Sequence, residues 1–148
     1  MASKIFVLNG SNLNRLGTRQ PEIYGTETLA SVAQRCTERG AALGLELDFR
    51  QTNFEGEMVE SVHDAIDNGA GIIMNPAGFT FQSVPLMDAL KMFDGPKIEV
   101  HISNVHQRDD PIYHHSMMSK VVTAVIAGMG TDGYLHALDW MANQVKRT

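Results

Sequence analysis

The sequence is poor in cysteine and in positive charge, and it has no long apolar run. Its single cysteine, Cys36, excludes an intrachain disulfide framework and favours a reducing compartment. The formal net charge of −5 argues against a nucleic-acid partner, because such proteins normally carry a basic surface. The apolar stretch in the N-terminal MASKIFVLNG is too short for a signal peptide or a membrane span. We therefore expect a cytoplasmic protein with neither a nucleic-acid nor a membrane partner.

No repeat, low-complexity tract or charged linker divides the 148 residues, so we expect one domain over residues 1–148. Short apolar runs of the kind that form buried strands recur along the chain. The strands predicted from these runs are 4–9, 45–51, 71–75, 97–103 and 121–128.

Helical spacing of apolar residues fills the intervals between these strands. After the first strand it predicts a helix with Cys36 on its apolar stripe, Thr26 as its cap and Gly44 at its end. The other predicted helices are 58–66, 83–93 and 135–145.

Strands that alternate with helices imply a parallel sheet covered on both faces. Because crossovers between parallel strands are right-handed, the expected α/β fold is a five-stranded, doubly wound, flavodoxin-like sandwich. Ligands of such folds bind outside the carboxyl ends of the strands, so we expect the functional residues there.

The predicted fourth strand, KIEVHIS, carries Glu99, His101 and Ser103 on one face, because successive strand side chains alternate between faces. Buried parallel strands are usually apolar throughout, so this polar face indicates a site. A carboxylate can orient a neighbouring imidazole and support its protonated form, which makes His101 a candidate proton donor or acceptor. The alternative is an edge strand with one solvated face and a histidine that is only structural.

A long loop follows the first strand and contains Asn12, Arg19 and Tyr24. Long loops in compact domains are usually lids, binding loops or disordered segments. A tyrosine hydroxyl becomes a base only where a nearby cation stabilises its phenolate, and Arg19 is the candidate cation. The alternative is an arginine that only solvates the loop and a tyrosine that only packs it.

Four motifs make the chain resemble the type II 3-dehydroquinate dehydratases over nearly its whole length. They are LNGSNLNRLGTRQPEIYG, NPAGFTFQSVPLMDAL, EVHISNVHQRDD and GMGTDGYLHAL. The resemblance implies the flavodoxin-like fold and the trans elimination of water from a cyclic β-hydroxy ketone, which converts 3-dehydroquinate to 3-dehydroshikimate. It also implies a reaction that uses no metal, no Schiff base and no other cofactor.

The same resemblance implies catalytic roles for five residues. Tyr24, as a tyrosinate, would remove the proton beside the ketone, and Arg19 would support it and close with the lid. Asn12 would help to hold the water that stabilises the enolate. His101, supported by Glu99, would protonate the departing hydroxyl.

The resemblance further implies how substrate and subunits are held. Asn75, the backbone N–H groups of Ile102 and Ser103, and the Ser103 hydroxyl would bind the substrate carboxylate. The loop over residues 13–25 would be a mobile lid. Asp88 would reach the site of a neighbouring subunit in a homo-oligomer, built from trimers that assemble into a dodecamer.

The chain departs from the family pattern on one side of the expected pocket. The family's substrate-binding histidine is replaced by Phe81, which Gln82 follows, and its second substrate-binding arginine aligns best with Tyr113. A phenyl ring cannot hydrogen-bond a hydroxyl, and an apolar wall removes water from a hydroxyl without replacing it. The preferred substrate is then a related carboxylated ring ketone, unless Gln82 and Tyr113 rebuild the lost contacts.

Two other patterns in the chain do not predict cofactor sites. The glycine-rich stretch 128–133 follows a strand as a dinucleotide fingerprint does, but too little chain follows it for the rest of that unit. We interpret it as a tight turn with close helix–strand packing. The spacing of His101, His106, His114 and His115 matches no common zinc site, so we expect no metal.

Three functions are therefore open from the sequence. The first is a dehydratase acting on 3-dehydroquinate, in aromatic amino acid biosynthesis through shikimate or in quinate catabolism. The second is a paralogue that dehydrates a related carboxylated cyclic β-hydroxy ketone. The third is a non-catalytic small-molecule sensor, against which the retained acid and base argue, because binding alone requires neither.

Overall fold

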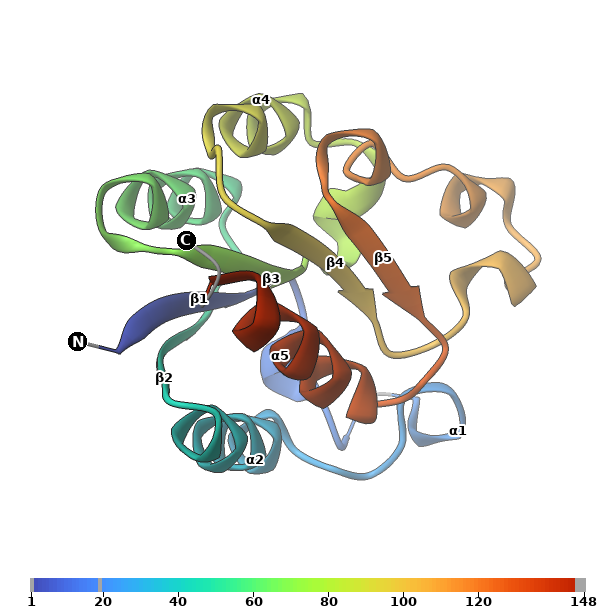
Figure 1. Ribbon diagram of the computed structural model, residues 1–148. Coiled ribbons are helices and arrows are strands. Elements are labelled where there is room, and N and C mark those ends of the chain that lie inside the picture. Colours follow the sequence, from blue (N-terminus) through green and yellow to red (C-terminus); the bar gives the residue numbers. More distant parts are fainter. Residues whose placement is uncertain (1, 19, 146–148) are drawn as a thin grey trace.

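Five parallel strands form the centre of the molecule in the computed structural model, which describes residues 2–18 and 20–145. Their order across the sheet is β2-β1-β3-β4-β5 (Figure 1). The strands are β1 (Ser3–Asn9), β2 (Leu45–Gln51), β3 (Gly71–Asn75), β4 (Lys97–His101) and β5 (Ala124–Ala127). This arrangement confirms the predicted five-stranded parallel α/β fold. The predictions made for Arg19 lie outside the described residues.

Helices cover both faces of the sheet, with α2 and α5 on one face and α3 and α4 on the other (Figure 1). The helices are α1 (Pro21–Tyr24), α2 (Leu29–Ala42), α3 (Glu55–Asn68), α4 (Val84–Met92) and α5 (Asp132–Val145). Alternate residues of β1 enter the two cores: Val7 packs with the α2 and α5 side, and Phe6 with the α3 and α4 side. A strand that is buried on both faces needs apolar residues throughout, which explains the sequence of β1. Among the described residues, no helix has the length and apolar character needed to cross a membrane.

The helix that contains Cys36 is capped two residues later than the sequence predicted. Thr28, not Thr26, is the N-cap of α2, and its hydroxyl oxygen accepts a hydrogen bond from the Ser31 N–H at 3.2 Å. A cap must have extended backbone one residue before the first helical turn, and Thr28 has it. Cys36 is buried as predicted, and burial raises the pKa of its thiol to about 12.

The fourth and fifth strands are shorter than predicted: a glycine turn takes the backbone bonds at the end of β4, and a 3₁₀ turn over Ser119–Val121 occupies the predicted start of β5. β4 ends at His101, and the N–H groups of Gly128 and Gly130 bond the carbonyls of His101 and Ile102 at 3.2 and 3.0 Å. Both glycines have positive φ, which confirms the predicted tight turn after β5. Ile102 and Ser103 therefore leave the sheet at its carboxyl edge.

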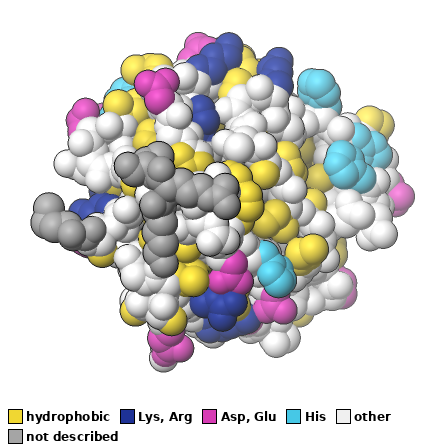
Figure 2. All heavy atoms as spheres, in the orientation of Figure 1, with side chains coloured by type: hydrophobic (Ala, Val, Ile, Leu, Met, Phe, Trp, Pro, Cys, Tyr) yellow, Lys and Arg dark blue, Asp and Glu magenta, His cyan; other side chains and the backbone are white. Residues whose placement is uncertain are grey.

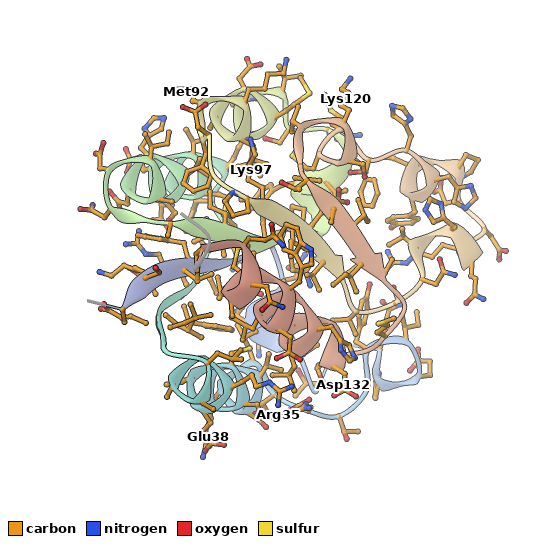
Figure 3. The ribbon with its side chains drawn as sticks, viewed as in Figure 1. Arg35, Glu38, Met92, Lys97, Lys120 and Asp132 are labelled. Atoms are coloured by element: carbon orange, nitrogen blue, oxygen red, sulfur yellow. The ribbon has the colours of Figure 1, made fainter. Side chains whose placement is uncertain are left out.

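A polar network joins α2 to the start of α5. Arg35 of α2 and Asp132 of α5 point toward one another (Figure 3), and their Nη2 and Oδ1 atoms are 2.6 Å apart. Arg35 also donates to the Glu27 carboxylate at 3.0 Å, and Thr131 donates to it as well. Although burial raises the pKa of Glu27, these hydrogen bonds outweigh burial and leave it below its usual value. Glu27, which lies between the long loop and α2, is thus hydrogen-bonded to Thr131, which follows the glycine turn.

Gly10, directly after β1, lies where no side chain fits. A Cβ at this position would be 2.2 Å from the Pro76 carbonyl oxygen, and the Gly10 N–H donates to the Asn75 carbonyl at 2.8 Å. The carboxyl ends of β1 and β3 approach one another through this contact. We expect Gly10→Ala to lower the free energy of unfolding by about 3 kcal/mol, measured by urea denaturation, because the backbone has to move.

Gly56 provides the matched control for Gly10→Ala, because a Cβ added at this position in α3 meets no atom within 4 Å. Gly56→Ala should stabilise the protein by about 0.5 kcal/mol, since alanine is the better helix former. A Gly10→Ala protein as stable as the wild type would disprove the contact.

Candidate active site

A cavity of about 220 Å³ opens at the carboxyl ends of β1, β3 and β4. The predicted site residues that line it are Asn12, Tyr24, Asn75, Phe81, His101, Ile102, Ser103 and Tyr113. Five further residues line it without having been predicted: Leu13, Ala77, Gly78, Val105 and Arg108. The sheet therefore gathers most of the predicted site into one place.

Three other predicted residues lie away from this cavity. Glu99 is behind His101, inside the sheet, with 1% of its surface exposed. Gln82 is exposed at the end of the 3₁₀ turn Ala77–Phe81 and does not line the cavity. Asp88 is exposed on α4, where its Oδ1 is 3.8 Å from the Lys91 Nζ. The cavity is thus built without the side chains of Gln82 and Asp88 of the same chain.

His101 and Glu99 form a buried hydrogen-bonded pair on β4. The imidazole Nε2 bonds Glu99 Oε2, and the hydroxyls of Ser116 and Ser119 donate to the same carboxylate at 2.9 and 2.8 Å. Burial raises the pKa of Glu99, but the bonds from His101, Ser119 and Ser116 outweigh it and hold that pKa below the ordinary value of 4.5. The Glu99 carboxylate therefore fixes the orientation of the His101 imidazole through its Nε2 atom.

The polar face of β4 is not the wet face of an edge strand. β4 lies between β3 and β5, and Met74 and Val125 flank Glu99 in the register of the sheet. The edge-strand alternative is therefore wrong. A carboxylate inside a parallel sheet requires hydrogen-bond partners, which His101 and the two serine hydroxyls supply.

Arg108 brings positive charge to Tyr24, and both residues line the cavity. Its Nη2 donates to the Tyr24 hydroxyl oxygen at 2.6 Å and to the Ser103 Oγ at 3.0 Å. The guanidinium also lies 4.5 Å from the ring centroid of Tyr113, a cation–π contact. Sequence reasoning assigned no role to Arg108, although the motif EVHISNVHQRDD contains it. A cation at hydrogen-bond distance from a tyrosine oxygen stabilises the phenolate form.

Phe81 and Tyr113 form an aromatic wall along the cavity. Their rings meet edge to face with centroids 5.3 Å apart, and Phe81 stacks against the His101 ring at 6.5 Å. Aromatic pairs of this geometry are attractive beyond the area that they bury. Phe81 thus links Tyr113 to the His101 ring.

Two non-glycine residues that line the cavity have left-handed backbone. Asn12 has φ of 69° and Ala77 has φ of 50°. Their N–H groups donate to side-chain oxygens: Asn12 to Asn53 Oδ1 at 2.8 Å, and Ala77 to Asn75 Oδ1 at 3.2 Å. Asparagine tolerates this conformation, whereas in alanine it stores strain of the kind that collects at functional sites.

Histidine side chains gather on the surface over the segment that follows β4 (Figure 2). His106, His114 and His115 line a second cavity of about 320 Å³, which Glu99 and His101 also border. Among residues 2–18 and 20–145, no three histidine, cysteine or acidic side chains are arranged to hold a metal ion. The Glu99–His101 pair therefore borders a second cavity, which is lined by histidine side chains.

We expect Ser119→Ala to destabilise the protein by about 1–2 kcal/mol at pH 7, because Glu99 loses a charge-assisted hydrogen bond. The depressed pKa of Glu99 contributes stability above pH 4.5, and that contribution disappears as pH falls through the lower folded-state value. Urea denaturation at several pH values should therefore show the two proteins converging as the pH falls below about 4.5.

The control for this experiment is Thr37→Ala. The Thr37 hydroxyl donates to a carbonyl of its own helix, and the side chain is exposed. Its free-energy difference from the wild type should be independent of pH. A difference for Ser119→Ala that is the same at pH 7 and in acid would contradict the role given to this hydroxyl.

Comparison with known proteins agrees with this geometry. Residues 3–142 match the family model described as dehydroquinase class II. The chain is 49% identical to the 3-dehydroquinate dehydratase of Bartonella henselae, over 99% of both chains. It is 50% identical to 3-dehydroquinate dehydratase 2 of Pseudomonas putida, over 96% of this chain and 95% of that one. The crystal structure of type II dehydroquinase from Propionibacterium acnes superposes with a TM-score of 0.93 at 45% identity, covering 97% of this chain and 98% of that one. The chain belongs to the class II dehydroquinase family.

Proposed function

We propose that this protein is a hydro-lyase that converts 3-dehydroquinate to 3-dehydroshikimate. The observation that carries the proposal is the pairing of two proton-transfer groups across one cavity, Tyr24 with Arg108 and His101 with Glu99. The names of the relatives support this substrate over a different ring ketone. A sensor that only binds its ligand requires neither a base nor an acid, so the retained pairs also argue against that alternative.

The reaction begins with removal of a proton from the carbon beside the ketone. The Tyr24 oxygen, as a phenolate held by the Arg108 guanidinium, takes this proton, and the C–H electrons move toward the ketone oxygen to form an enolate. Asn12 also lines the cavity and, in this mechanism, holds the water that bonds the enolate oxygen. Arg19 is a second candidate cation for the phenolate.

The second step expels the hydroxyl group as water. The enolate electrons re-form the ketone and create the ring double bond while the C–O bond breaks. His101, as an imidazolium supported by Glu99, gives its proton to the departing oxygen. Protons then pass from Tyr24 to solvent and from solvent to His101, which restores both groups for the next cycle.

The substrate carboxylate is bound at the end of β4. The backbone N–H groups of Ile102 and Ser103, the Ser103 hydroxyl and the amide of Asn75 all border the cavity there. Arg108 donates to Ser103 and so adds positive charge beside the anion. Bound in this way, the ring lies between Tyr24 and His101.

Phe81 and Tyr113 define the far side of the substrate ring. Tyr113 lines the cavity and, in this proposal, supplies a hydrogen bond to a ring hydroxyl, whereas Gln82 is exposed and does not line the cavity. The sequence suggested that Gln82 and Tyr113 together rebuild the contacts with the ring hydroxyls, and in this proposal Tyr113 does so without Gln82.

The segment 13–25 acts as a lid in this proposal. Gly17 and Gly25 have positive φ on either side of α1, which gives the backbone a hinge at each end, and α1 ends with Tyr24. Closing the lid over the substrate brings the base to the ring.

We also propose a cytoplasmic homo-oligomer of trimers assembled into a dodecamer. Phe54 and Val84, at the starts of α3 and α4, expose 66% and 48% of their surface, and Asp88 is exposed on the same helix as Val84. Contiguous exposed apolar side chains favour a protein interface. Asp88 at such an interface would lie beside a neighbouring subunit.

Turnover of 3-dehydroquinate, followed by ultraviolet absorbance of the enone product, tests the function directly. We expect Tyr24→Phe and His101→Ala each to lower kcat at least about 100-fold, because each removes one proton-transfer group. Thr37→Ala should keep wild-type activity. Lack of turnover by folded wild-type protein would refute the proposed function.

Replacement of Arg108 tests its role as the cation that supports the phenolate. Arg108→Met should lower kcat/KM roughly 100-fold at neutral pH, because the Tyr24 oxygen loses the cation that donates a hydrogen bond to it. Arg108→Lys should retain more activity than Arg108→Met. Arg15→Met, which removes an exposed arginine of the same loop region as Tyr24, is the control. Full activity of Arg108→Met at neutral pH would rule this role out.

A further inference from the structure

A chain of buried side chains connects the Asn75 amide to Tyr134 on α5, the tyrosine of the motif GMGTDGYLHAL. The Asn75 Nδ2 donates to the Tyr134 hydroxyl oxygen at 3.0 Å, and this hydroxyl donates to Asn9 Oδ1 at 2.6 Å. Asn9 Nδ2 then donates to the Arg50 carbonyl at 3.0 Å. These hydrogen bonds thus connect the end of β3 with β1 and β2, and they do so through a tyrosine of α5.

Each member of this chain is closed to water. Tyr134 and Asn9 expose 0% of their surface, and Asn75 exposes 4%. A buried polar group that lacks a partner is strongly unfavourable, so no hydroxyl or amide of the chain can turn freely. Burial also raises the pKa of Tyr134, which keeps its hydroxyl protonated and able to donate.

Two backbone groups fix the direction of every hydrogen bond in the chain. The Arg50 carbonyl can only accept, so Asn9 must present its NH₂ group there and its Oδ1 toward Tyr134. The Tyr134 O–H then has to donate to Asn9, which leaves only its lone pairs for Asn75. At the other end, the Ala77 N–H can only donate, and it bonds Asn75 Oδ1 at 3.2 Å.

The Asn75 amide is therefore held in one of its two possible orientations. Its oxygen faces the Ala77 N–H, and one hydrogen of its nitrogen is taken by Tyr134. The amide nitrogen carries two hydrogens, so the second is left for an anion in the cavity that Asn75 lines. The flipped orientation would put an oxygen against the lone pairs of Tyr134 and present an acceptor in place of this donor.

We propose that Tyr134 and Asn9 are positioning residues that hold the Asn75 amide with its N–H donor toward the substrate carboxylate. This inference rests on the proposed function, in which Asn75 binds that carboxylate. It gives Tyr134, which lies on α5 and does not line the cavity, a role in substrate binding.

Tyr134→Phe tests the proposal, because it removes only the hydroxyl. We expect KM for 3-dehydroquinate to rise roughly tenfold, the effect of one positioned hydrogen bond, while kcat changes less than about threefold. In protein that already carries Asn75→Ala, the same substitution should change KM by less than about twofold, because residues that act through one another are not additive. Equal effects in the two backgrounds would overturn the proposal.

Met141→Leu is the matched control for packing. Met141 is fully buried on the same helix as Tyr134, in the same core, but has no part in the hydrogen-bonded chain. This variant should change the melting temperature without changing KM. If Tyr134→Phe and Met141→Leu changed both quantities alike, Tyr134 would be a packing residue only.

A measurement without substrate separates this inference from the proposed function. The Asn75 side-chain amide, assigned in ¹H–¹⁵N spectra by its disappearance in Asn75→Ala, should shift and exchange faster in Tyr134→Phe. Asn9→Ala leaves the tyrosine but removes its acceptor, so it should give the same result even if Tyr134→Phe fails to fold. An unchanged Asn75 resonance in either variant would refute the positioning role. If wild-type protein did not turn over 3-dehydroquinate, the proposed function would fail. The spectrum would still show whether Tyr134 and Asn9 hold the Asn75 amide.

Discussion

The parallel register that sets Asn9 of β1 beside Asn75 of β3 is the constraint on which the site depends. Both strands end at this pair, and Gly10 continues from β1 across the Pro76 carbonyl because it has no side chain. Pairing of β4 with β3 then places Glu99 and His101 along the same edge. Three segments that are distant in the sequence therefore share one cavity, as expected at the carboxyl edge of a doubly wound sheet.

Charge is distributed over this cavity in two separate hydrogen-bonded groups. Glu99 is buried and accepts three hydrogen bonds, so its negative charge is compensated inside the sheet. Arg108, which also lines the cavity, donates to both Tyr24 and Ser103. The buried carboxylate thus lies beside His101, and the guanidinium lies beside Tyr24.

Several features were predictable because their causes are local. Apolar runs and helical spacing gave the five strands and four of the five α-helices in their order along the chain, but missed the short α1 inside the long loop. The positions of Glu99 and His101 two residues apart placed them on one strand face. The N-cap was misplaced at Thr26 because two threonines precede the helix and the sequence does not show which has the extended backbone. Gln82 was expected in the pocket beside Phe81, but neighbouring residues of a 3₁₀ turn point in different directions and only Phe81 faces the cavity.

The sequence by itself determined the α/β architecture and the pairing of Glu99 with His101, since both follow from patterns within short segments, and its motifs named most of the residues that line the cavity. Only the tertiary structure brought Arg108 to Tyr24, because the two residues are 84 positions apart. It also decided that β4 lies inside the sheet, and that Tyr134 reaches Asn75 across 59 positions. Such contacts depend on strand order and on how α5 packs over the sheet, and no local pattern encodes that geometry.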